Sequence, residues 1–141
     1  MPNFSLIPLD LPEGARRRLL LLEVDGKTPY VAFEKEMSKG GKRKEMQKIS
    51  ILFDEIAMGR DIPPNAIKPI KGRLPEDNWE EFELRKNQVR VYFFVIPPDG
   101  NIIVLGEFKK SDKEQRKTIG YFQELKQQFK EFYPSMKIEE E

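Results

Sequence analysis

The spacing of apolar residues changes along this chain, and each change predicts a new strand or helix. The nearly continuous apolar run from Arg17 to Val24 predicts a first strand. It ends at Asp25-Gly26, a pair suited to the positive φ angles of a tight turn. Thr28-Pro29 is typical of a helix start, with an N-cap residue followed by proline at the first helical position. Gly40-Gly41 ends the short helix that follows.

Two longer helices are predicted from apolar residues that recur every three or four positions. The first runs from about Lys42 to Met58 and is ended by Gly59 and the prolines of Ile62-Pro63-Pro64. Its apolar stripe consists of Met46, Ile49, Leu52, Phe53, Ile56 and Ala57. The second begins after the capping residue Ser111 and reaches Pro134, with a stripe of Ile119, Phe122, Leu125, Phe129 and Phe132. The tail 134–141 is interpreted as a frayed end or a short added strand.

Three strands are predicted between these helices. Trp79 to Arg85 alternates between apolar and charged residues, whereas Gln88 to Ile96 is more uniformly apolar and is expected at the centre of a sheet. Asn101 to Phe108 completes an antiparallel meander through the Pro-Pro-Asp-Gly turn at 97–100.

The order of these elements predicts one α+β domain over residues 1–141. It would have an antiparallel sheet of three to four strands, a two-helix N-terminal layer and a C-terminal helix, with the helices packed on one face of the sheet. Residues 1–16 are predicted to form an irregular N-terminal extension.

Composition narrows the chemistry that such a domain could perform. The chain has neither cysteine nor histidine, which excludes disulfides, thiol nucleophiles, a serine triad and a zinc deaminase site. Any catalysis must therefore use arginine, lysine, tyrosine or carboxylates, and no metal site is predicted. The apolar run from Leu19 to Leu22 is too short to span a bilayer, so a cytoplasmic protein with no membrane partner is expected.

The distribution of charge is more informative than its total, because the formal net charge is only +1. Acidic residues gather between positions 76 and 83, and cations between positions 39 and 48. Arginine and lysine also flank the two most apolar strands, between Glu83 and Lys110. Strands this apolar belong in a sheet core, so the flanking cations suggest a role other than folding.

Four short motifs follow one another along the second half of the chain. They are KPIKG at 68–72, FELR at 82–85, VRVYFFV at 89–95 and NIIVLGEFKK at 101–110. Their order and spacing resemble the RelE/ParE superfamily of toxins from type II toxin–antitoxin systems, and specifically its phage-derived, HigB-like branch. That branch typically shows a Lys-x-Leu-x-Gly loop, a Glu-Leu-Arg strand, an Arg-Val-x-Tyr/Phe strand and Phe-x-Lys-Lys leading into a helix. The resemblance covers roughly Val31 to Phe132.

The resemblance implies a RelE-like fold and a small toxin that a cognate antitoxin, a helix-turn-helix protein, holds inactive. Such a toxin inhibits translation by cutting mRNA at the ribosome, as an endoribonuclease (an mRNA interferase) that uses no metal and no cofactor. RNA cleavage by the neighbouring 2′-hydroxyl requires cations that bind the phosphate and its extra transition-state charge. It also requires one group that accepts a proton and another that returns it.

Four residues are the candidate catalytic groups. Arg85 and Arg90 lie on adjacent predicted strands near their connecting turn, so both guanidinium groups could bind one phosphate. Lys109 ends the last strand at the same edge, and Tyr92 shares the face of Arg90, where it could stack on a base or relay a proton. The candidate RNA-binding residues are Lys68, Lys71, Arg73 and Lys110.

The chain departs from the family pattern in its acidic residues. Glu81 and Glu83 stand on the strand where the best-known ribosome-dependent members carry lysines, and those toxins are strongly basic. Carboxylates beside Arg85 would repel a phosphate. Two alternatives to the ribonuclease therefore remain open: a gyrase-directed, ParE-like toxin, and a catalytically inactive RelE-fold binding module.

Overall fold

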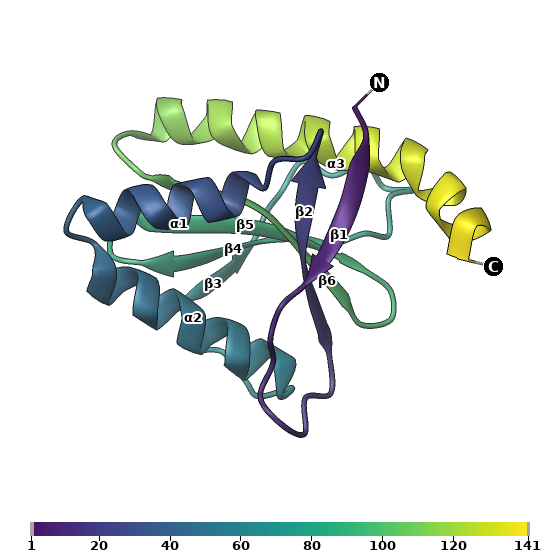
Figure 1. Cartoon of the computed structure of the whole chain (residues 1–141). Helices are drawn as coiled ribbons and strands as arrows, with labels where there is room; N and C mark the ends of the chain where they lie inside the picture. The colour runs from purple at the N-terminus through teal and green to yellow at the C-terminus, as the bar shows by residue number, and fades with distance from the viewer. Residues whose placement is uncertain (1, 141) are drawn as a thin grey trace.

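In the computed structural model, which describes residues 2–140 and the side chains of residues 2–136, a six-stranded mixed sheet carries three helices (Figure 1). In chain order the elements are β1 (Phe4–Pro8), β2 (Arg18–Val24), α1 (Pro29–Lys39), α2 (Arg43–Ala57), β3 (Ile67–Pro69), β4 (Glu81–Lys86), β5 (Val89–Ile96), β6 (Gly100–Phe108) and α3 (Asp112–Glu140). The strands lie in the order β1-β2-β6-β5-β4-β3, with β2 parallel to β6 and all other neighbours antiparallel. The α+β class is as the sequence predicts.

Helices cover both faces of the sheet because β5, one of its two central strands, is apolar on both sides. Val91 and Phe93 belong to the core beneath α1 and α2, whereas Tyr92 and Phe94 belong to the core beneath α3. The prediction that the 88–96 strand is central is confirmed, but the prediction that the helices share one face is wrong. A strand buried on both sides gives no local signal of which helix covers which face.

The sheet contains strand pairings that the sequence analysis did not predict. β1 falls within residues 1–16, for which an irregular extension was expected, and pairs with β2 from Phe4 opposite Val24 to Pro8 opposite Leu20. β3, only three residues long, adds a sixth strand beside β4. The sheet is therefore mixed and six-stranded, and not an antiparallel sheet of three to four strands. These pairings depend on partners distant in the chain, on which local apolar spacing carries no information.

The last helix is longer than predicted. Ser111 caps its start, with Oγ accepting a hydrogen bond from the Glu114 backbone N–H at 3.1 Å, as expected. α3 then continues through Pro134 to Glu140, so the tail 134–140 is helical and neither frayed nor a strand. Apolar contacts on both sides of the proline, from Tyr133 and Met136 to the core beneath α3, stabilise this continuation. Residue 141 lies outside the described residues.

A buried ion-pair network attaches α3 to the segment before β4. The Lys126 side chain is 2% exposed, and its Nζ donates to Asp77 Oδ2 at 2.7 Å, to Glu81 Oε2 at 2.8 Å and to the carbonyl oxygen of Trp79. Lys130 Nζ donates to Asp77 Oδ1 at 2.8 Å. Burial alone would raise the pKa of Asp77, but the hydrogen bonds from Lys126 and Lys130 outweigh it and lower the pKa to about 2.

Gly106 allows α1 to rest directly on β6. A Cβ at this position would lie 2.5 Å from two ring carbons of Phe33 and 3.0 Å from the carbonyl oxygen of Arg90. We expect Gly106→Ala to lower the free energy of unfolding by roughly 1–3 kcal/mol, as measured by chemical denaturation, because the ring or the strand must shift. The control is Gly120→Ala in α3, where the added Cβ meets nothing within 4 Å. Wild-type stability of Gly106→Ala would contradict this close approach.

Asp77 should make stability depend on pH in the acid range. Because its folded-state pKa is lowered from 3.8 to about 2, its contribution is complete above pH 3.8 and is lost as the pH falls through about 2. Asp77→Asn is expected to lower the free energy of unfolding by roughly 2 kcal/mol near neutral pH. Urea titrations should show this difference shrinking toward pH 2. Asp99→Asn, which removes only an exposed ion pair with Arg18, is the control. A difference that stays constant with pH would contradict the assignment.

Candidate functional site

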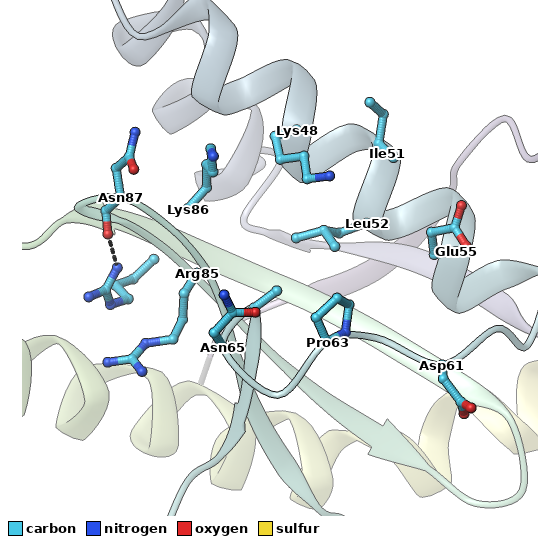
Figure 2. A pocket seen from close by; sticks show the side chains of 12 residues that line it. Lys48, Ile51, Leu52, Glu55, Asp61, Pro63, Asn65, Arg85, Lys86 and Asn87 are labelled. Carbon is cyan, nitrogen blue, oxygen red and sulfur yellow. Dashed lines mark hydrogen bonds between the residues drawn. The ribbon is translucent and has the colours of Figure 1, made fainter.

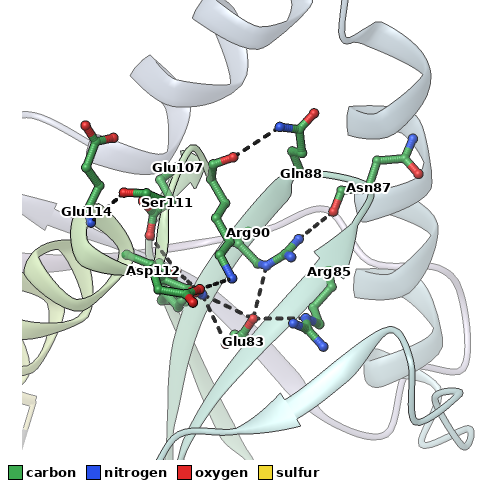
Figure 3. Close-up of polar contacts among 12 residues, drawn as sticks. Glu83, Arg85, Asn87, Gln88, Arg90, Glu107, Ser111, Asp112 and Glu114 are labelled. Atoms are coloured by element: carbon green, nitrogen blue, oxygen red, sulfur yellow. Dashed lines mark hydrogen bonds and ion pairs between the residues drawn. The ribbon is translucent and has the colours of Figure 1, made fainter.

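The end of the sheet where β4 turns into β5 brings two arginines and a glutamate together (Figure 3). Arg85 lies opposite Arg90 and Glu83 lies opposite Tyr92 in the β4–β5 pairing, so all four side chains share the α3 face. Glu83 Oε2 is 3.1 Å from Arg85 Nε and 3.2 Å from Arg90 Nε. The two predicted phosphate ligands therefore converge, and the group between them is a carboxylate.

The two arginines differ in how firmly they are held. The Arg90 side chain is 10% exposed, and its Nη1 donates to the carbonyl oxygens of Asn87 at 2.6 Å and Val89 at 3.1 Å. The Arg85 side chain is 31% exposed. Both Nε atoms are within ion-pair distance of Glu83, yet among the described residues neither has a hydrogen-bond partner. The two Nε–H groups are therefore held by charge attraction to Glu83 and not by well-directed hydrogen bonds.

Arg85 and Arg90 also line a pocket of about 670 Å³ between α2, the 61–66 segment and the β4–β5 turn. Figure 2 shows Lys48, Ile51 and Leu52 of α2 on one side of this pocket, with Lys86 on the turn. Its other lining residues are Glu55, Asp61, Pro63, Asn65, Ala66 and Asn87. The volume lies within the range of natural small-ligand sites, and the lining includes four cationic and two acidic residues. We call it the arginine pocket.

Tyr92 is placed differently from the prediction. It is 0% exposed beneath α3, and its hydroxyl donates to Glu107 Oε2 at 2.5 Å and accepts from Gln115 Nε2 at 3.1 Å. Burial, and then the hydrogen bond to Glu107, raise the pKa of Tyr92 above its usual value. A covered and protonated phenol can neither stack on a base nor accept a proton, so the predicted role of Tyr92 is corrected to a structural one.

The remaining predicted residues lie in three places. Lys109 Nζ pairs with Asp112 Oδ1 at 2.8 Å beside the start of α3, and Lys110, which follows it, is exposed. Lys68 and Lys71 line a second groove, between β3 and α3. Arg73 lines a separate cavity of about 110 Å³, to which Glu81 also contributes, and its Nη1 donates to the carbonyl oxygen of Asp77.

No family model matches this chain, and comparisons with curated proteins and with solved structures found no match. The functional argument therefore depends on the geometry of the site. Among the described residues, no cluster of three or more acidic side chains could hold a metal ion. None of the described helices combines the length and the apolar character that crossing a membrane requires.

Sequence reasoning missed several residues of this site. Glu83 was expected as a carboxylate beside Arg85, whereas its contact with both arginines follows from the β4–β5 register. Lys86 could have been found from its position beside the predicted turn. Lys48 reaches the arginine pocket only because α2 packs across the sheet, which no local pattern reveals.

We expect Tyr92→Phe to lower the free energy of unfolding by roughly 1–3 kcal/mol, because the half-buried Glu107 would lose the hydroxyl donor. Urea denaturation measures the change. Tyr121→Phe is the control, since Tyr121 is 53% exposed and its substitution should change stability by less than about 0.5 kcal/mol. Equal stability of the wild type and Tyr92→Phe would show that the Tyr92–Glu107 contact is not structural.

Proposed function

We propose that this chain is a RelE-like, HigB-type toxin that inhibits translation by cutting mRNA at the ribosome without a metal ion. It would act in the cytoplasm, and a cognate helix-turn-helix antitoxin would neutralise it. The order of its elements supports this proposal: two N-terminal strands are followed by two helices, four consecutive strands and a helix, and the Lys-, Arg- and Phe-containing motifs run from β3 to the residues before α3.

The observation that carries the proposal is the convergence of Arg85 and Arg90 on Glu83, beside the arginine pocket that both arginines help to line. Their Nε atoms lie within 3.1 and 3.2 Å of one oxygen of Glu83, and neither has a hydrogen-bond partner among the described residues. Two guanidinium groups around one oxyanion can stabilise the charge that develops on a phosphate during cleavage. Lys48 and Lys86 add positive charge along the pocket wall.

In the proposed reaction, the 2′-oxygen attacks the neighbouring phosphorus and the bond to the 5′-oxygen of the next nucleotide breaks. The products are a 2′,3′-cyclic phosphate and a 5′-hydroxyl. Glu83 is the carboxylate next to the two guanidinium groups that would bind the phosphate, and its position makes it our candidate for the group that accepts the 2′-hydroxyl proton. Lys68 lies opposite Glu83 in the β3–β4 register, and hence on the same face, so it is our candidate for returning a proton to the 5′-oxygen.

A second candidate function is a catalytically inactive RelE-fold binding module. The pairing of both arginines with Glu83 favours it, because a carboxylate that already neutralises the cations competes with a phosphate. The burial of Tyr92 favours it too, since it leaves the site without an accessible tyrosine. The two candidates differ in whether the bound RNA is cut.

We expect induction of the wild-type chain in a bacterial host to stop protein synthesis and to leave cut transcripts. Arg90→Ala should lower the cleavage rate about 100- to 1000-fold, which is the usual effect of removing one preorganised donor. Protein labelling and mapping of transcript ends measure the two effects. Arg17→Ala is the matched control, because it removes an exposed arginine that lines neither the arginine pocket nor the groove between β3 and α3.

Arg90 is largely buried, so thermal unfolding must show that Arg90→Ala still folds. Arg85→Ala, at a more exposed position, provides a second test and should lower cleavage in the same direction. Normal growth under induction, or cut transcripts with both variants, would overturn the ribonuclease proposal. DNA damage with intact transcripts would instead support a gyrase-directed toxin, and RNA binding without cleavage would support the binding module.

A further inference from the structure

A second groove lies beside the arginine pocket, between β3 and the first half of α3. Its volume is about 490 Å³, and Glu83 contributes to its wall. The ion pair between Glu83 and Arg85, at 3.1 Å, therefore separates this groove from the arginine pocket, which Arg85 lines. An extended ligand that reaches the arginines from one side would enter the groove on the other.

The groove combines cations with apolar side chains. Lys68, Lys71 and Arg116 supply three positive charges, and Ile70 and Ile119 supply apolar surface. Lys109, Arg116 and Lys68 each lower the pKa of Asp112 at the start of α3, and Lys109, which donates a hydrogen bond to it, has the largest effect. A polyanion that carries flat apolar rings would contact both the cations and the apolar side chains of this surface, whereas a simple anion would contact only the cations.

Gly120 leaves the α3 side of this groove open. It lies within α3 and lines the groove, and a Cβ at this position would meet nothing within 4 Å. Glycine inside a helix is destabilising relative to alanine, and no neighbouring side chain requires it here. Its effect is to leave the helix backbone open to a ligand in the groove.

We propose that this groove binds one nucleotide of a single-stranded RNA, next to the phosphate held by Arg85 and Arg90. The base lies over Gly120 between Ile70 and Ile119, and the flanking phosphates contact the cations of the groove, Lys68, Lys71 and Arg116. A base can reach such a groove only when it is unpaired and turned out of a helix, so the ligand is single-stranded. This inference rests on the proposed function, because it takes the same RNA as its ligand.

The test is fluorescence anisotropy with a dye-labelled single-stranded RNA of about six nucleotides, carrying 2′-O-methyl groups so that it cannot be cut. Gly120→Leu fills the groove and should weaken binding about tenfold or more, while it leaves the thermal midpoint unchanged or raised. Gln127→Leu, at an exposed and neutral position of α3 outside this groove, is the matched control and should bind like the wild type.

Arg116→Ala should weaken binding about fivefold and lower the dependence of affinity on salt by about one phosphate contact, and Arg17→Ala should change neither. Wild-type affinity of Gly120→Leu would overturn the inference. So would equal binding of a duplex RNA of the same length, or no binding of the single strand to the wild-type chain.

The outcomes separate this inference from the proposed function. If transcripts stay intact on induction but Gly120→Leu and Arg116→Ala still weaken oligonucleotide binding, the cleavage proposal fails and the groove assignment stands. If transcripts are cut while both groove variants bind like the wild type, the groove assignment alone fails.

Discussion

The burial of β5 on both faces is the constraint on which the rest of the structure depends. Any polar group on its α3 side must find a partner inside the protein, because water does not reach it and an unpaired buried charge is costly. Arg90 therefore contacts Glu83 and the carbonyls of the turn, and the hydroxyl of Tyr92 binds Glu107. The candidate site thus follows from the way in which an apolar core accommodates a few polar residues near the end of its central strand.

The same constraint explains how a chain with a net charge of +1 can present a basic site. The acidic residues before and at the start of β4 pair with lysines of α3, at the end of the strand that lies far from the β4–β5 turn. Asp77 and Glu81 bind Lys126 and Lys130 of α3, so these carboxylates do not oppose a phosphate at the β4–β5 turn. Glu83 is different, since it lies between the arginines themselves. The net charge of the chain therefore does not indicate the local charge of this surface. That local charge depends on which cation each carboxylate pairs with.

The sequence predicted most of the helices and strands, but it predicted less well which of them pair or pack with one another. Apolar spacing located α1, α2 and all three meander strands, because each is a local pattern with a clear start or end signal. It could not reveal that β1 pairs with β2, that β2 runs parallel to β6, or that α3 lies opposite α1. Those features depend on long-range packing. For the site, adjacent strands and a short turn were enough to bring Arg85 and Arg90 together, but the burial of Tyr92 depended on where α3 lies.

The different exposure of the two arginines suggests how a phosphate could compete with Glu83. Arg90 is held by two carbonyl oxygens besides the carboxylate, so turning it outward would break several contacts at once. Arg85 is more exposed and has Glu83 as its described ion-pair partner, so it can turn toward the pocket at a smaller cost. Arg90 would then keep Glu83 in place as Arg85 binds the phosphate. In the cleavage that we propose, the carboxylate that neutralises the two arginines would thereby remain close to the phosphate, where a proton acceptor is needed.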